Sequence, residues 1–75
     1  MNVEKLDLSA FAKRIRDLRQ ERGVSAMTVG LAIGISDTTI ISWENEKYVP
    51  KLDTAFLVSR YFGVSMDYLC GLRDY

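Results

Sequence analysis

The sequence of 75 residues is long enough for one small domain with a modest core. Ten Lys and Arg balance ten Asp and Glu, and this net charge of zero excludes a protein that coats nucleic acid by charge alone. Histidine is absent and Cys70 is the only cysteine, so the chain lacks an intrachain disulfide and the usual general base and metal ligand. We therefore expect no enzyme activity, no metal site and no cofactor.

One recurring pattern predicts five helix starts. An apolar residue precedes Ser or Asp, and a second apolar residue follows after three intervening residues, as in Leu6-Asp7 and Phe11. This spacing is typical of a hydrophobic staple around an N-cap, whose side-chain oxygen accepts a hydrogen bond from the first turn. The candidate N-caps are Asp7 or Ser9 for the first helix and then Ser25, Ser36, Asp53 and Ser65.

Glycine and proline predict where these helices end. Glycine adopts the left-handed conformation that closes many helices, and it lies at or just after the end of four of the expected helices, at Gly23, Gly34, Gly63 and Gly71. Pro50 keeps the stretch 47–51 non-helical. In chain order we predict helices over residues 8–22, 26–33, 37–45, 54–62 and 66–71.

Apolar stripes at helical spacing predict the core faces of these helices. Residues 38–41 are an exception, because their β-branched run favours a strand. The Ser36 cap and the continuation of the apolar stripe from Ile40 to Trp43 favour a helix there instead. The other stripes lie at Phe11, Ile15 and Leu18 in the first helix and at Ala55, Val58 and Phe62 in the fourth.

Residues 26–45 contain the pattern of a helix-turn-helix. Two short helices are joined by Gly34-Ile35-Ser36, a three-residue turn that contains glycine. Gly30 supplies the small residue that crossing helices need where they touch. The apolar residues that would face the rest of the domain are Val29, Ile33, Ile35, Ile40 and Trp43.

Four blocks of sequence carry a family resemblance. They read RDLR and RG within 16–23, GIS, I and WEN within 34–45, P and LD within 50–53, and YFGVSMDYL at 61–69. With these blocks the sequence resembles the lambda-repressor-like, Cro-type helix-turn-helix domains (the XRE family) of bacterial and phage transcriptional regulators. The resemblance covers roughly residues 11–71.

This resemblance implies an all-α fold, a compact five-helix bundle that forms a single helix-turn-helix domain over residues 1–75. It implies a sequence-specific double-stranded DNA-binding transcriptional regulator, for which repression is the better expectation. The helix at 37–45 would read the major groove of a near-palindromic operator. We expect such a protein to be cytoplasmic, and nucleoid-associated when it is bound to DNA.

The side of this helix opposite Ile40 and Trp43 carries the candidate DNA contacts. The resemblance implies base contacts by the outward-facing residues Asp37, Thr38, Ile41 and Ser42. Asp37 also fits a first-turn acid that complements the helix dipole, and this role is slightly favoured. The candidate phosphate contacts follow the helix, with one addition from the first helix, and are Asn45, Lys47, Tyr48, Lys51 and Arg14.

Two charged residues have a structural role in this interpretation. Family members often carry Arg and Glu where this chain has Arg19 and Glu44, so the resemblance implies an ion pair between the first and third helices. The other basic residues of 13–22 would mostly form a solvated face with salt-bridge partners. We expect Cys70 to be a core or interface residue, because no histidine is available to activate its thiol.

Departures from the family pattern keep a second function open. Ala26 stands where the family often has Gln, and Glu46 stands where it often has Gly. Met27 and Leu31 form an apolar face where charged residues are usual. The alternative is a protein-interaction module on the same fold, with little or no DNA binding.

The last residues of the sequence predict self-association. Leu72 and Tyr75 are apolar and have no evident core partner, so we expect a weak homodimer through Tyr68–Tyr75. No apolar run approaches the roughly 18 residues of a membrane span, so we expect no membrane association.

Overall fold

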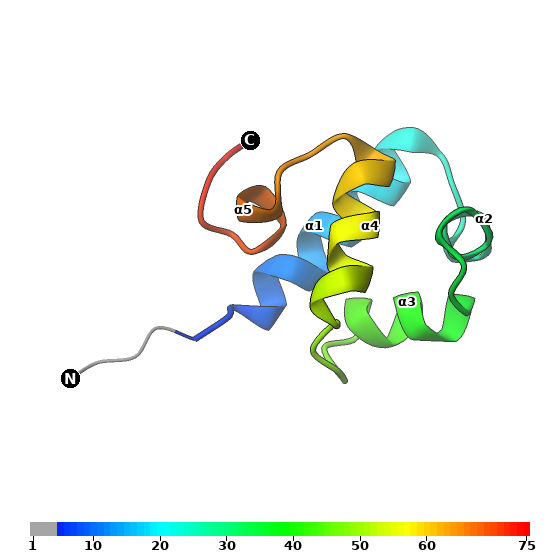
Figure 1. Ribbon diagram of the computed structural model, residues 1–75, viewed down its shortest axis with the longest axis horizontal. Helices are drawn as coiled ribbons and strands as arrows, with labels where there is room; N and C mark the ends of the chain where they lie inside the picture. Colours follow the sequence, from blue (N-terminus) through cyan, green and yellow to red (C-terminus); the bar gives the residue numbers. More distant parts are fainter. Residues whose placement is uncertain (1–4) are drawn as a thin grey trace.

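The computed structural model describes residues 5–75, which form five α-helices and no strand. Figure 1 shows α1 passing behind α4 near the centre, with α2 and α3 toward one side and α5 on the other. The predicted all-α, five-helix fold is confirmed. The helices are α1 (Leu8–Arg22), α2 (Ala26–Ile33), α3 (Asp37–Glu44), α4 (Leu52–Phe62) and α5 (Met66–Leu69).

Four helices begin at a predicted N-cap whose side chain accepts a backbone hydrogen bond. At α1 the cap is Asp7 and not Ser9: Ser9 Oγ donates to Asp7 Oδ1 at 2.6 Å, and the backbone N–H of Ala10 donates to the same oxygen at 3.2 Å. These two bonds hold the pKa of Asp7 below its ordinary value of 3.8. The remaining caps are Ser25, Ser36 and Ser65.

The predicted start of α4 is wrong by two residues. The helix begins at Leu52, and Lys51 occupies the cap position without a side-chain hydrogen bond. Asp53 lies inside the first turn, where its Oδ1 accepts from the N–H of the next residue, Thr54, at 2.8 Å. The N-cap pattern predicts a staple between Leu52 and Leu57 on either side of Asp53, but both side chains are exposed.

Two predicted helices, 37–45 and 66–71, also extend too far at their C-terminal ends. The third helix ends at Glu44, with Asn45 as its C-cap. The last helix ends at Leu69, two residues before Gly71, because Cys70 already occupies the C-cap position. Both corrections concern single turns and leave the arrangement of the helices unchanged.

One hydrophobic core receives side chains from all five helices. The rings of Phe11 and Trp43 meet edge to face, with centroids 5.8 Å apart, and so join α1 to α3. The predicted apolar stripes are confirmed. The largest fully buried side chains are Phe11, Phe62, Ile15, Ile40, Leu69, Val29 and Val58.

Three helices end in the same glycine-containing backbone motif. A left-handed glycine donates its N–H to the carbonyl three residues earlier, and the next residue donates to the carbonyl five residues before it. Without a Cβ, glycine adopts this positive φ at no steric cost. The three glycines are Gly23 after α1, Gly63 after α4 and Gly71 after α5.

Candidate nucleic-acid interface

Gly30 fixes how closely α2 approaches the turn that leads into α3. A Cβ on Gly30 would lie 2.5 Å from the carbonyl oxygen of Ile35, a backbone atom that cannot swing away. The Gly30 carbonyl also accepts from the N–H groups of Gly34 and Ile35, at 2.8 and 2.9 Å. The predicted close contact at Gly30 is therefore present, and it sets the crossing of the two helices.

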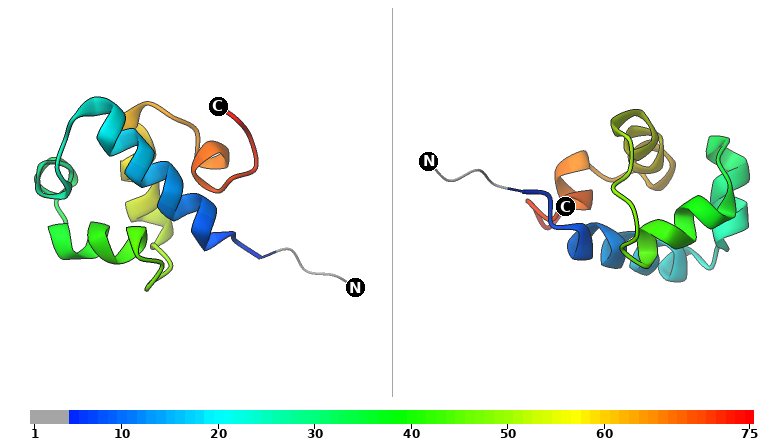
Figure 2. Two further views of the ribbon diagram at one scale, coloured as in Figure 1. Left: turned by 180° about the vertical axis from the view of Figure 1, so that it is seen from behind. Right: turned by 90° about the horizontal axis from the view of Figure 1, so that it is seen from below.

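The third helix lies along one edge of the molecule. Its inner side is fully buried at Ile40 and Trp43, as predicted. Figure 1 shows α3 and the loop after it at the lower edge, and Figure 2 (right) shows them in front when the molecule is seen from below. The outer side carries the four candidate base contacts: Thr38 and Ile41 are exposed, while Asp37 and Ser42 are half-buried.

Thr38 is coupled to the cap of its own helix. Its Oγ1 lies 2.6 Å from Ser36 Oγ, and its backbone N–H donates to that oxygen at 3.1 Å. The hydroxyl of a candidate base contact is thereby held at the N-terminal end of α3, where short polar side chains of a groove helix reach base edges.

The C-terminal end of α3 is anchored to α1 by charge. Arg19 Nε donates to Glu44 Oε2 at 2.6 Å, and Arg19 Nη2 donates to Oε1 at 2.8 Å. Glu44 is 7% exposed and the Arg19 side chain 19%. The bonds to Glu44 raise the pKa of Arg19 above its ordinary value. The structure therefore contains the ion pair that the resemblance implied.

Arg16 adds a contact that the sequence did not predict. Its Nη2 donates to the backbone carbonyl of Glu44 at 2.7 Å, and its Nε lies 3.8 Å from Glu44 Oε1. The solvated face predicted for most of the basic residues of 13–22 therefore does not account for Arg16. Its spacing along α1 carries no signal for this bond, because the bond depends on where α3 ends in space.

The loop 45–51 carries most of the candidate phosphate contacts. Its polar side chains are all exposed and follow directly from the end of α3. Arg14 lies elsewhere: its guanidinium stacks 4.1 Å from the centre of the Tyr68 ring and donates to the carbonyl of Arg73 at 3.4 Å. The structure therefore places Arg14 with the C-terminal tail and brings together the exposed loop residues Asn45, Lys47, Tyr48 and Lys51.

A glutamate takes the left-handed position after α3. Glu46 has φ 60° and is the one residue other than glycine with a positive φ among residues 5–75. Its N–H donates to the Trp43 carbonyl at 3.0 Å, and Lys47 N–H donates to the Ser42 carbonyl at 2.9 Å. The end of α3 thus has the same closure as the glycine-containing ends, with an exposed acid in place of glycine.

Within residues 5–75, no group of His, Cys, Asp and Glu side chains could hold a metal ion. None of the helices in this part of the chain has the length and apolarity to cross a membrane.

Two short helices that cross at a buried glycine, with the second exposed along one edge, define a helix-turn-helix domain. Residues 15–69, most of the chain, match the family model described as helix-turn-helix. The chain belongs to this helix-turn-helix family. It is the XRE family of lambda-repressor-like DNA-binding transcriptional regulators.

Two curated relatives support this membership. Over 54 residues the chain is 35% identical to the cryptic phage CTXphi transcriptional repressor RstR of Vibrio cholerae, covering 72% of this chain and 49% of that protein. Over 64 residues it is 31% identical to the HTH-type transcriptional regulator YobD of Bacillus subtilis (strain 168), and the match covers 85% of this chain and 57% of that protein. The chain spans about half the length of these relatives.

A solved structure shows the same fold. The P22 c2 repressor, crystallised in complex with a synthetic operator, superposes with a TM-score of 0.79 and 25% sequence identity. The match covers 84% of this chain and 96% of that one. The two relatives are a transcriptional repressor and a transcriptional regulator, and this neighbour is a repressor.

Proposed function

We propose that this protein is a cytoplasmic repressor that inserts α3 into the major groove of a double-stranded operator. One observation carries the proposal. The third helix is fixed from behind by its buried side and by the anchored Glu44, while its opposite side is exposed and leads into Lys47 and Lys51. A helix held in this way can enter a groove without disturbing the core.

The outer side of α3 supplies the base contacts in this proposal. The hydroxyls of Thr38 and Ser42 can bond to either kind of base edge, and the apolar Ile41 suits a thymine methyl. Asp37 could accept from a cytosine amino group, but an acid near phosphates is costly. Its position in the first turn of α3 fits the helix dipole better.

The loop 45–51 supplies the phosphate contacts. Lys47 and Lys51 are exposed cations next to the end of the groove helix, and Asn45 and Tyr48 are exposed hydrogen-bonding groups beside them. Such contacts fix the register of the protein on the duplex and give binding its salt dependence, but they carry no sequence information.

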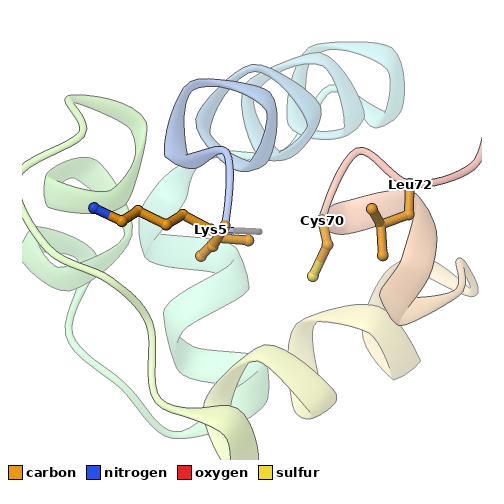
Figure 3. A pocket seen from close by; sticks show the side chains of 4 residues that line it. Lys5, Cys70 and Leu72 are labelled. Atoms are coloured by element: carbon orange, nitrogen blue, oxygen red, sulfur yellow. The ribbon is translucent and has the colours of Figure 1, made fainter. Parts of the chain in front are cut away.

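The protein is proposed to bind as a weak dimer through Tyr68–Tyr75. Leu72 and Tyr75 are exposed. Figure 3 shows the side chains of Cys70 and Leu72 beside a hollow of about 250 Å³ that Lys5 and Leu6 also line. Contact between two such apolar ends would give a two-fold dimer. Its operator would be a near-palindrome with half-site centres about 34–36 Å apart.

Selection of bound fragments from a pool of random duplexes tests the proposal. We expect a motif with two-fold symmetry. Ser42→Gln should change the preference at one or two base pairs, each by about 1–3 kcal/mol. Lys47→Ala should weaken binding to all sequences alike and reduce the salt slope by roughly one. If the Ser42 variant also loses affinity uniformly, Ser42 does not read a base, and an asymmetric single half-site would contradict the dimer.

A second function is favoured by the outer face of α2. Met27 is 59% exposed and Leu31 79%, and they lie one turn apart on the same side of the helix. A protein-interaction module would use this apolar face and bind little or no DNA. Retention on duplex DNA at low salt, released as salt rises, supports the repressor, whereas no retention even at low salt supports the module.

A further inference from the structure

The closure of α3 differs from three others in the molecule by a single residue. The motif after α1, α4 and α5 places glycine at the left-handed position, and the motif after α3 places Glu46 there, with the same two hydrogen bonds. A side chain with a Cβ makes this conformation less favourable than glycine does. Glu46 therefore lowers the stability of the domain at a position where the chain uses glycine elsewhere.

The charge of Glu46 is not neutralised by the protein. Glu46 is exposed, and no ion pair among residues 5–75 includes it. It lies between Asn45 and Lys47, two of the residues proposed to contact phosphates. An exposed carboxylate at this point repels the phosphate backbone at the place where Lys47 attracts it.

We propose that Glu46 is a negative determinant of DNA affinity. It weakens the binding of the loop 45–51 to any duplex and does not change which sequence α3 prefers. The inference rests on the proposed DNA-binding function. It follows because phosphate contacts dominate affinity and carry no sequence information, so a charge that opposes them acts on all sequences alike.

Three variants separate the charge of Glu46 from its backbone strain. Glu46→Gln removes the charge and keeps the length of the side chain and the left-handed strain. Glu46→Gly removes both. Glu21→Gln is the matched control, because it makes the same charge change at an exposed position near the C-terminal end of α1. That end lies toward the top of Figure 1, away from the loop 45–51 at the lower edge.

Affinity is measured for the selected operator and for a duplex of scrambled sequence, from low to high salt. We expect Glu46→Gln to bind both duplexes roughly three- to tenfold more tightly at low salt, and the gain to shrink as salt screens the exposed charge. Its denaturant midpoint should rise only slightly, because an acid is removed from the negative end of the α3 dipole. Glu46→Gly should show the same gain in affinity together with a clearly higher midpoint. Glu21→Gln, also near the C-terminal end of a helix, should show at most the same slight rise in midpoint and no gain in affinity.

The outcomes distinguish this inference from the proposed function. If the unchanged protein binds duplex DNA and Lys47→Ala weakens it, but Glu46→Gln leaves affinity as it was, the inference is overturned and the proposed function stands. A gain for one sequence only makes Glu46 a base-reading residue, and a loss for both makes it a favourable contact. Either result also overturns the inference. If the unchanged protein binds no duplex at low salt, both are overturned.

Discussion

The C-terminal ends of α1 and α3 have the same two backbone hydrogen bonds, but they differ in the left-handed residue and in the contacts that hold them. The end of α1 has Gly23 at the left-handed position, with open space where a Cβ would be. The end of α3 has Glu46 there, and Glu44, two residues earlier, is bound by Arg19 and Arg16, which lie 25 and 28 positions away along the chain. One helix end is therefore encoded locally, and the other depends on tertiary contacts that hold α3 to α1.

The largest expected effect comes from removing the tertiary anchor of α3. Glu44→Ala leaves the largely buried Arg19 guanidinium without a countercharge, with only the bond from its Nη1 to the Val24 carbonyl at 3.1 Å, and should cost about 3–5 kcal/mol. This is a large share of the about 5–15 kcal/mol that stabilises a domain. Denaturant midpoints measure the loss, and duplex affinity should follow folding, because neither residue of the pair is assigned to the DNA surface.

A double variant provides the control for this loss. Arg19→Met with Glu44→Met replaces the pair by two apolar side chains and should recover much of the stability, since desolvation offsets most of the attraction in a buried pair. Stability near that of the unchanged protein for Glu44→Ala alone would contradict the anchor, and Arg19 would then become a candidate phosphate contact.

A smaller loss of stability is expected from substituting two glycines that have different roles, Gly30 inside α2 and Gly23 after α1. Gly30→Ala pushes a Cβ to 2.5 Å from the backbone oxygen of Ile35, so the helices must separate, at a cost of about 3 kcal/mol. Gly23→Ala meets no atom within 4 Å but keeps a φ of +65°, at a cost of about 1 kcal/mol. Denaturant midpoints compare the two, and equal losses would show that the contact at Gly30 is not tight.

The smallest effect on stability concerns the N-caps at the starts of α1 and α3. The cap of α1 is the ionisable Asp7, and that of α3 is the neutral Ser36. The bonds from Ser9 and Ala10 lower the pKa of Asp7, so its contribution to stability is present above pH 3.8 and is lost as pH falls through the lowered pKa. The midpoint difference between the unchanged protein and Asp7→Asn should therefore shrink between pH 7 and pH 3, and a constant difference would contradict this.

Local signals in the sequence predicted four of the five helix starts and the inward side of α3. They failed at α4, where Asp53 bonds to its immediate neighbour Thr54 and leaves the cap position to Lys51. They missed the bond from Arg16 to the end of α3, and likewise Arg22 Nη2, which donates to the Phe62 carbonyl at 2.6 Å. Such bonds join helices far apart in sequence, so no spacing along one helix predicts them.

The residues proposed to read DNA differ in how strongly the fold constrains their substitution during evolution. Thr38 shares hydrogen bonds with Ser36, the cap of its own helix, so replacing it alters the start of α3 as well as the surface of that helix. Ile41 is exposed in the middle of the helix and has no part in the cap. A lineage that acquires a new operator would therefore pass through changes at Ile41 before Thr38, because the first step leaves the fold intact while specificity drifts.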